Sequence, residues 1–243
     1  YPIRRLPKWT MKREIPRGVV TNPKSRACGI SNNQDNAKYC RCNSPGFHEK
    51  NVAACDTFYL MEFFAQVRKQ LKLDEKSELR VCMVCLGNIC RSPMAAAVLH
   101  NRSRDFLSPK IIVDSAGTGA WHVGEGPNFS SEAMWRNAGY EYEHTAKQFT
   151  GEFFSSRDLI LVMDSSNYQN VLSLADDSNQ TSKVFYLRQF DPALSQIDPR
   201  GPEVKRLEVP DPYGLADRAF EKVLEMVEDS VSGLLELLTS SKG

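Results

Sequence analysis

Cys85 and Arg91 are the pair of residues in this chain whose types and spacing are best suited to chemistry on a phosphate ester. They lie at the two ends of a loop between an apolar, β-branched run at 81–84, which is typical of an interior strand, and a predicted helix over 93–104 that opens with proline. A loop that leaves a strand and enters a helix directs its backbone amides and the positive end of the helix dipole at one point, where a dianion binds well. Gly87 allows the sharp bend that such a loop needs.

This C-x5-R arrangement favours covalent phosphoryl transfer. A free cysteine thiol has a pKa of about 8.5, and the loop amides, the helix dipole and Arg91 would each lower it toward the thiolate form. The planar guanidinium of Arg91 can bind two phosphoryl oxygens together and follow the group as it flattens in the transition state. The hydroxyl of Ser92 can donate to the sulfur and make it a better leaving group. We therefore expect a cysteine-dependent phosphatase that needs no cofactor.

The cysteines also have other interpretations. Cysteine is often buried, so those near a strand can simply be part of the core. The spacing of Cys82, Cys85 and Cys90 resembles a metal site, but a second pair of ligands is missing nearby. Upstream, four cysteines and a histidine could bind zinc but lack the paired knuckles of most zinc sites, so the sequence leaves open whether a metal binds there: Cys28, Cys40, Cys42, Cys55 and His48.

The string Val84-Cys85-Leu86-Gly87-Asn88-Ile89-Cys90-Arg91-Ser92-Pro93 closely resembles the active-site loop of the low-molecular-weight protein tyrosine phosphatases. The resemblance covers residues 79–243. Five further strings follow in the family's order: 114–118 (DSAGT), 121–124 (WHVG), 144–148 (HTAKQ), 163–167 (MDSSN) and 209–213 (VPDPY). The resemblance implies a small doubly wound sheet and hydrolysis of phosphotyrosine in proteins.

The resemblance also implies roles for individual residues. Cys85 is the expected nucleophile, Arg91 the phosphate clamp and Asp211 the general acid that later takes a proton from water. Asp211 follows the nucleophile by more than a hundred residues, as in the small phosphatases and unlike the larger ones. The residues expected to hold the loop in shape are Asn88, Ser92, Ser115 and His144.

A phosphate bound in this loop would contact its backbone, and a flat substrate ring would lie between aromatic side chains at the mouth of the cleft. The expected substrate-binding residues are Leu86, Gly87, Asn88, Ile89, Cys90, Ser92, Trp121 and Tyr213. Cys90 has a second interpretation, because its position near Cys85 would let it trap an oxidised nucleophile as a disulfide. Reversible redox control is the resulting hypothesis.

Three other functions are compatible with such a loop. An arsenate reductase shares this fold and loop but passes oxidation to cysteines further downstream, whereas no cysteine follows Cys90 here. A non-catalytic module could bind phosphotyrosine in the same cradle, although intact Cys85, Arg91 and Asp211 argue against it. The third is hydrolysis of small phosphate esters.

Strands alternate with helices along the chain, which predicts an α/β fold: a parallel sheet with helices on both faces. The predicted strands are 79–84, 111–114, 159–163 and 184–186; the predicted helices are 93–104, 130–137, 168–174 and 220–238. We divide the chain into a partly irregular segment at 1–55, an amphipathic helix and linker at 56–78 that begins at Asp56 or Thr57, and the phosphatase domain at 79–243.

Charge is unevenly distributed although the net charge is +1. Residues 1–55 hold eleven of the 31 Lys and Arg residues and three of the 30 Asp and Glu residues. We interpret this segment as a solvated tail, with an acidic partner as the alternative, and expect no nucleic acid partner. The sequence has no signal-peptide pattern and no apolar run of the roughly 20 residues that cross a bilayer. With few, scattered cysteines, a cytoplasmic location is expected.

Overall fold

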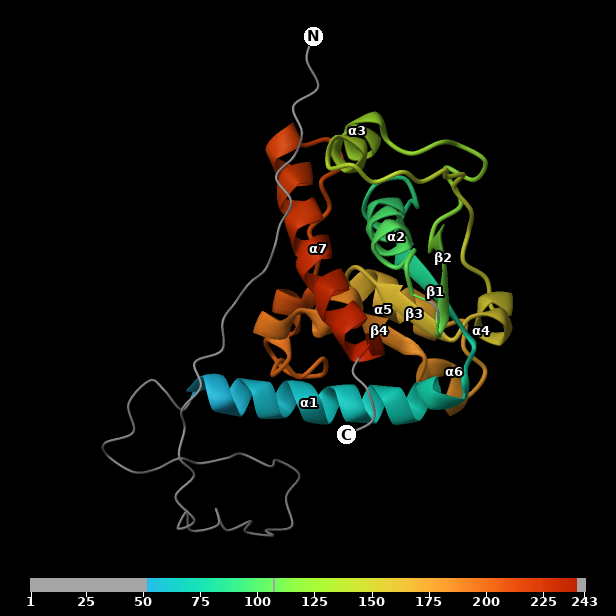
Figure 1. Cartoon of the computed structure of the whole chain (residues 1–243). Coiled ribbons are helices and arrows are strands. Elements are labelled where there is room, and N and C mark those ends of the chain that lie inside the picture. Colours follow the sequence, from blue (N-terminus) through green and yellow to red (C-terminus); the bar gives the residue numbers. More distant parts are fainter. Residues whose placement is uncertain (1–51, 107, 240–243) are drawn as a thin grey trace, which may run out of the picture. The chain divides into compact units, whose positions relative to one another are not determined.

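A computed structural model of the chain describes residues 52–106 and 108–239, with side chains from residue 60 onward. All of these residues lie in one compact unit, Gly46–Gly243. Its centre is a sheet of four parallel strands: β1 (Glu78–Cys85), β2 (Lys110–Gly117), β3 (Leu159–Val162) and β4 (Val184–Tyr186). The strand order is β2-β1-β3-β4, so β1 lies between two parallel neighbours (Figure 1).

The two faces of the sheet carry separate apolar clusters, because side chains alternate along each strand. On one face, Leu79, Val81 and Met83 of β1 belong to the cluster that includes residues of α2 (Arg91–Arg102) and α7 (Asp217–Thr239). On the other face, Cys82 and Val84 belong to the cluster that includes Val171 of α5 (Ser165–Leu172) and Phe154 of α4 (Glu152–Ser156). The predicted α/β fold, with helices on both faces of a parallel sheet, is confirmed.

The helix before the domain, α1 (Val52–Leu71), begins four residues earlier than predicted. Asp56 and Thr57 were expected to cap it, but both lie inside the helix, and the preceding Val-Ala-Ala run continues the helix toward the N-terminus. Phe64 and Val67 of α1 are buried in the cluster shared with α2 and α7. The Arg68 guanidinium donates to the main-chain oxygen of Leu237 near the end of α7, at 2.7 Å.

Other element bounds differ from the prediction for local reasons. Helix α5 begins at Ser165 rather than at 168, because the Asp164 side chain accepts a hydrogen bond from the backbone N–H of Asn167 and caps the helix. Helix α3 (Phe129–Asn137) stops before Gly139, as expected, where φ is +87°. Short elements without a long apolar repeat were not predicted: α4, α6 (Ser178–Thr181), η2 (Leu73–Glu75), η3 (Leu187–Phe190), η4 (Pro192–Leu194) and η5 (Val204–Leu207).

No helix within 52–106 and 108–239 combines the length and apolar character that a membrane crossing needs. The same described residues contain no group of three or more His, Cys, Asp or Glu side chains placed to hold a metal ion. The upstream set of Cys28, Cys40, Cys42 and His48, and the side chain of Cys55, lie outside the described residues.

Candidate active site

The loop from Cys85 to Arg91 lies where the fold directs ligands. Cys85 is the last residue of β1, in the interior of the sheet, and pairs with Gly117 at the end of β2. Arg91 is the first residue of α2. The loop therefore connects the carboxyl end of a central parallel strand to a helix N-terminus, which is the usual ligand site of an open α/β sheet.

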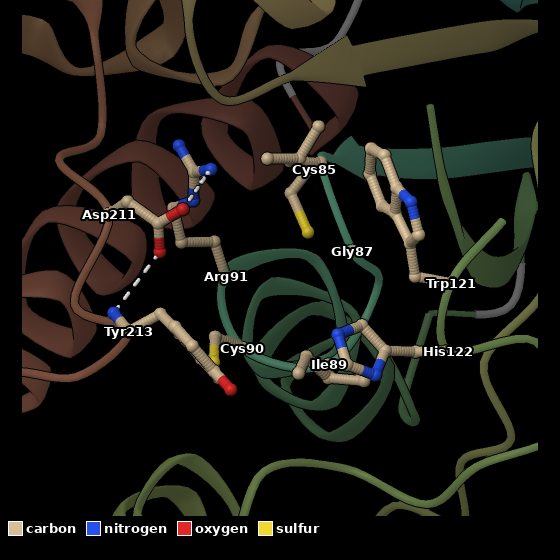
Figure 2. A pocket seen from close by; sticks show the side chains of 10 residues that line it. Cys85, Gly87, Ile89, Cys90, Arg91, Trp121, His122, Asp211 and Tyr213 are labelled. Carbon is tan, nitrogen blue, oxygen red and sulfur yellow. Dashed lines mark hydrogen bonds and ion pairs between the residues drawn. The ribbon is translucent and has the colours of Figure 1, made fainter. Parts of the chain in front are cut away.

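Two groups lie within hydrogen-bonding distance of the Cys85 sulfur, one in the loop and one in the first turn of α2. The Ser92 hydroxyl lies 3.0 Å from the sulfur, and the backbone N–H of Asn88 points at it from 3.3 Å. Cys85 is only 2% exposed, yet its side chain lies at the floor of the pocket shown in Figure 2. The Asn88 N–H donates to the sulfur and the Ser92 hydroxyl can also donate, and such contacts stabilise negative charge on the sulfur.

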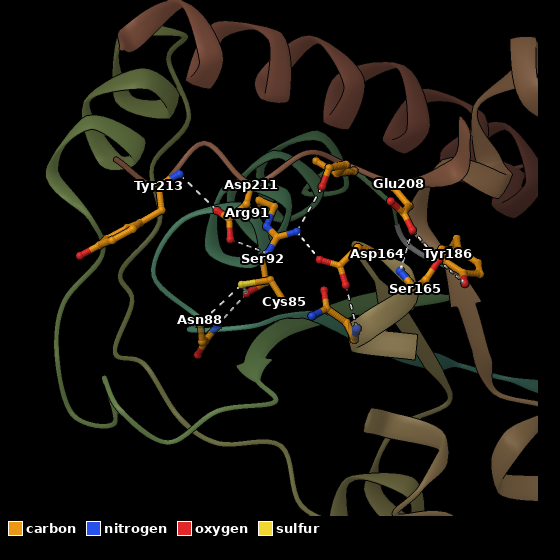
Figure 3. A network of polar contacts seen from close by, with 12 residues as sticks. Cys85, Asn88, Arg91, Ser92, Asp164, Ser165, Tyr186, Glu208, Asp211 and Tyr213 are labelled. Atoms are coloured by element: carbon orange, nitrogen blue, oxygen red, sulfur yellow. Dashed lines mark hydrogen bonds and ion pairs between the residues drawn. The ribbon is translucent and has the colours of Figure 1, made fainter. Parts of the chain in front are cut away.

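Asn88 has an unusual backbone conformation, and its side chain makes several hydrogen bonds that hold the loop in place. Its φ of +57° lies in the left-handed region. The side-chain NH2 donates to the hydroxyl of Ser92 at 2.9 Å (Figure 3) and to that of Ser115 at 2.8 Å, and the side-chain oxygen accepts from the backbone N–H of Lys147 at 2.9 Å. The structure thus brings the residues of the predicted support network together around Asn88.

His144 completes this network from outside the loop. Its Nε2 lies 2.7 Å from the main-chain oxygen of Asn88, so the ring nitrogen carries a hydrogen and donates. Burial lowers the pKa of His144 below its ordinary value, and the nearby Lys147 lowers it further, against the opposing effect of the Asn88 hydrogen bond. A neutral ring with hydrogen on Nε2 is therefore favoured at neutral pH.

Arg91 is buried, with 3% of its surface exposed, and its guanidinium is held by three oxygens. It contacts the carboxylates of Asp164 at 2.5 Å and Asp211 at 2.8 Å, and donates to the main-chain oxygen of Val209 at 3.1 Å. Burial alone would lower the pKa of Arg91, but the negative groups Cys85, Asp211 and Asp164 more than offset it and raise the pKa above its ordinary value. The guanidinium is therefore a permanent cation in a fixed orientation (Figure 3).

Asp211 reaches the site from the segment that follows η5. This segment is attached to the sheet by the backbone N–H of Val209, which donates to the main-chain oxygen of Met163 at 2.7 Å. The Asp211 carboxylate accepts from the backbone N–H of Tyr213 at 3.2 Å and remains partly exposed. A carboxyl group thus lies beside the guanidinium in the pocket (Figure 2).

The pocket has a volume of about 190 Å³ and is open between two exposed aromatic side chains. Trp121 is 71% exposed and Tyr213 is 60% exposed. Figure 2 shows them on opposite sides of the loop. The residues that line the pocket are Cys85, Leu86, Gly87, Ile89, Cys90, Arg91, Trp121, His122, Asp211 and Tyr213.

Comparison with known proteins now decides the family. A sequence model of the family described as low molecular weight phosphotyrosine protein phosphatase matches residues 80–242. The chain belongs to this family. The family predicted from the motifs, a family of phosphatases, is confirmed. The match begins two residues into β1, so helix α1 lies outside the part of the chain that the family shares.

The matches to individual relatives extend over more than nine tenths of each relative's length. A low molecular weight protein-tyrosine-phosphatase of Streptomyces coelicolor is 44% identical over 157 residues, which is 64% of this chain and 91% of the relative. The crystal structure of a protein tyrosine phosphatase from Entamoeba histolytica is 30% identical, with a TM-score of 0.57, covering 65% of this chain and 95% of that one. The structure of an arginine phosphatase from Geobacillus stearothermophilus is 27% identical, with a TM-score of 0.54. The match covers 65% of this chain and 91% of that one.

Two residues of this phosphatase site were not identified as site residues from the sequence. Asp164 belongs to one of the quoted motifs, and its position directly after a strand is the signal that would have indicated it, but its ion pair with Arg91 joins residues 73 positions apart. His122 also belongs to a quoted motif; its ring lies over Gly87, and its Nδ1 is 2.8 Å from a Glu125 carboxylate oxygen.

Cys90, expected as a redox partner for the nucleophile, lines the same pocket and is buried. Burial raises its pKa to about 12, and the charges of Cys85 and Asp211 contribute to the increase. Cys90 is therefore a neutral thiol at physiological pH.

Proposed function

We propose that this chain hydrolyses phosphotyrosine in proteins through a cysteinyl-phosphate intermediate, with Cys85 as nucleophile, Arg91 as phosphate clamp and Asp211 as general acid and base. The observation that carries the proposal is the position of the Cys85 sulfur, at the floor of a pocket beside a buried, oriented guanidinium and a carboxyl group.

In the first step the Cys85 thiolate attacks the phosphorus atom as the bond between phosphorus and the phenolic oxygen breaks. The carboxyl proton of Asp211 goes to the departing oxygen, which leaves as a neutral phenol. Arg91 and the loop amides bind the equatorial oxygens, on which negative charge accumulates. Because Asp211 contacts Arg91 at 2.8 Å, binding of the dianion to the guanidinium would exchange that carboxylate for phosphoryl oxygens and free Asp211 to act on the leaving group.

In the second step Asp211, now a carboxylate, takes a proton from water as the water oxygen attacks phosphorus. The bond between phosphorus and sulfur breaks, and the sulfur leaves as a thiolate. The hydroxyl of Ser92 and the N–H of Asn88, at 3.0 and 3.3 Å from the sulfur, support this departure because both can donate to it. The same two contacts favour the thiolate before the first step.

A phosphotyrosine substrate is favoured by the walls of the pocket. Trp121 and Tyr213 offer exposed aromatic surface on opposite sides of the loop, and a phenyl ring between them would bury its apolar faces. The ring of Trp121 lies on Gly119, where any β-carbon would collide with the indole. Glycine at 119 therefore supports the position of this wall.

The decisive experiment measures phosphate release from phosphotyrosine, phosphoserine, phosphoarginine and acyl phosphate substrates. We expect phosphotyrosine to have the highest kcat/KM; Cys85→Ser should be inactive yet retain ligand, and Asp211→Ala should lose most with poor leaving groups, which need protonation. Phosphoarginine is included because a structural relative is an arginine phosphatase. A uniform loss across leaving groups in Asp211→Ala would contradict the assigned acid.

The rival functions give different outcomes in the same assay. Binding of a phosphotyrosine peptide without phosphate release would indicate a binding module, and release only from small esters would indicate a non-protein substrate. Arsenate reduction would need a further thiol after Cys90, and residues 91–243 contain no cysteine. Thiol-dependent arsenite formation by the purified protein would support that rival.

We also propose that Cys90 protects Cys85 from irreversible oxidation. A hydroperoxide would convert the Cys85 thiolate to a sulfenic acid; the Cys90 sulfur would then attack the Cys85 sulfur, forming a disulfide and releasing water. Peroxide-inactivated wild type should recover with dithiothreitol, whereas Cys90→Ser should recover less. Equal recovery of the two proteins would exclude this role.

Reversible thiol chemistry of this kind fits a reducing compartment, so a cytoplasmic location remains our proposal. An acidic partner for residues 1–55 remains a prediction from their charge, because those residues lie outside the described part of the chain.

A further inference from the structure

Large apolar side chains that remain exposed are concentrated around the catalytic pocket. Within the described side chains, eight large hydrophobic residues are exposed, and only Met61 and Leu174 lie on other elements. The remaining six we call the apolar rim: Leu86, Trp121, Val123, Phe129, Tyr213 and Leu215. Scattered exposed apolar residues are normal, but a group of them around one opening marks an interaction surface.

Leu86 belongs to the catalytic loop itself, and three other segments carry the remaining members of the rim. The turn that bears Trp121 and Val123 follows Gly119, whose N–H donates to the main-chain oxygen of Leu86 at 2.9 Å. Phe129 opens α3 directly after Asn128, whose N–H donates to the main-chain oxygen of Ile89 at 2.8 Å. These contacts place both segments against pocket residues.

The third segment is the turn after Asp211. The N–H of Leu215 donates to the main-chain oxygen of Pro212 at 3.0 Å, so the chain folds back and keeps Leu215 close to Tyr213. The rim therefore has one part on the side of Trp121 and another on the side of Tyr213, with the pocket between them (Figure 2). A polypeptide whose phosphorylated side chain enters the pocket would pass over both parts.

Phe129 is the member least explained by the fold. It is 84% exposed, and it is the only phenylalanine among the described side chains that is classed as exposed. The first position of a helix has no structural need for an aromatic side chain, and water contact of this much apolar surface is unfavourable. In the described part of the chain, the rings of Phe129, Trp121 and Tyr213 make no ring contact with another aromatic side chain.

We propose that the apolar rim is a docking surface for the polypeptide around the phosphorylated residue, and that it selects substrates with large apolar side chains on both sides of that residue. This inference rests on the proposed function and adds the sequence context that the site prefers. An extended peptide advances about 3.3 Å per residue, so side chains within about three positions of the phosphotyrosine would reach the rim.

The test compares two phosphotyrosine peptides of equal length and charge, one with leucine or phenylalanine and one with serine or glutamine at the flanking positions. Wild type should have a kcat/KM about tenfold higher for the apolar peptide. Phe129→Ala and Leu215→Ala should each remove most of this preference, because each removes a side chain that the peptide would bury. Met61→Ala and Leu174→Ala are matched controls, since they shorten exposed apolar residues elsewhere and should leave the preference intact.

A small aryl phosphate separates this inference from the proposed function. It fills only the pocket, so its kcat/KM should stay within about twofold of wild type in Phe129→Ala and Leu215→Ala. Failure of wild type to hydrolyse the aryl phosphate would overturn the proposed function itself. Normal hydrolysis of it, with equal kcat/KM for the two peptides, would overturn only the docking surface.

A second copy of this chain is the other occupant that the experiment must detect. Sedimentation velocity of wild type and Phe129→Ala, over the concentrations used for kinetics, reports self-association. We expect the same monomeric mass for both proteins. A wild-type dimer that Phe129→Ala dissociates, with no change in peptide preference, would assign the rim to self-association and contradict the proposal.

Discussion

The catalytic loop and helix α1 are both held against the same sheet, but by different forces. The loop is held by directed hydrogen bonds: Asn88 alone connects Ser92, Ser115, the Lys147 backbone and His144. Helix α1 is held mainly by apolar burial, with Phe64 and Val67 in the core and the Phe63 ring 5.5 Å from that of Phe190. Directed contacts fix the positions of reacting atoms, whereas apolar packing supplies stability with little control of geometry.

This difference predicts that mutations in the two regions affect different measurements. In α1, Phe64→Ala should destabilise the protein by about 3 to 4 kcal/mol, because it empties a site that is 3% exposed. Its kcat for an aryl phosphate should stay close to wild type under conditions where the protein is folded. Urea unfolding followed by circular dichroism, together with steady-state kinetics, measures both effects.

Met61→Ala is the matched control on the same helix. Met61 is 56% exposed, so shortening it should change stability by less than about 0.5 kcal/mol. A large loss of kcat in folded Phe64→Ala would break the comparison, because it would show that α1 controls the geometry of the site.

In the loop, Asn88→Ala should reduce kcat by about 100-fold. It removes three side-chain hydrogen bonds, each contributing about 1 kcal/mol, and places alanine at a φ of +57° that it adopts less readily than asparagine. Kinetics with an aryl phosphate measures the effect, since that substrate needs only the pocket.

Asn101→Ala tests whether the result is specific to the loop. Asn101 also makes side-chain hydrogen bonds, one partly buried to the main-chain oxygen of Ala97 and one exposed to that of Glu141, but it lies in α2 away from the pocket lining. It should lower stability and leave kcat unchanged. Equal losses of kcat in the two variants would show that general destabilisation, rather than loop geometry, explains the effect.

The same contrast explains what the sequence could predict. The loop could be located from the sequence because the end of β1, the bend, Cys85, Arg91 and the helix that follows are contiguous from 81 to 99, although α2 begins at Arg91, two residues before the predicted start. The start of α1 was predicted wrongly because Asp56 and Thr57 are good capping residues, whereas the helix continues through the alanines before them. Local propensity does not decide between a helix that begins at a capping residue and one that continues past it. For α5 the error had the opposite sense: Asp164 does cap the helix, but the predicted start was later in the chain.

Long-range contacts account for the rest of what could not be predicted. The carboxylates on Arg91 come from Asp164 and Asp211, which are 73 and 120 residues away along the chain. Only the resemblance to a family indicated Asp211, and the position of Asp164 after a strand did not show that it pairs with Arg91. The exposure of Phe129 was equally hidden, because an aromatic residue at a helix start is usually assigned to the core.

Substitution of His144 is expected to have the smallest effect of these variants, and it separates an effect on stability from an effect on the geometry of the loop. Burial lowers its pKa, so the unfolded chain, with an ordinary histidine pKa near 6.5, binds the proton first as the pH falls. The stability that depends on neutral His144 is therefore complete above about pH 7 and is lost progressively as the pH falls through 6.5 toward the lowered value. His144→Gln should flatten this dependence of Tm on pH.

His100 provides the comparison, because burial and the nearby Arg104 lower its pKa as well, while its ring lies against Tyr142 instead of the loop. His100→Gln should also flatten the Tm profile in the same pH range, with kcat unchanged. His144→Gln should in addition lower kcat several-fold, because only His144 donates to the main-chain oxygen of Asn88. If His144→Gln alters the Tm profile and leaves kcat intact at every pH, the hydrogen bond to Asn88 stabilises the fold without positioning the nucleophile loop.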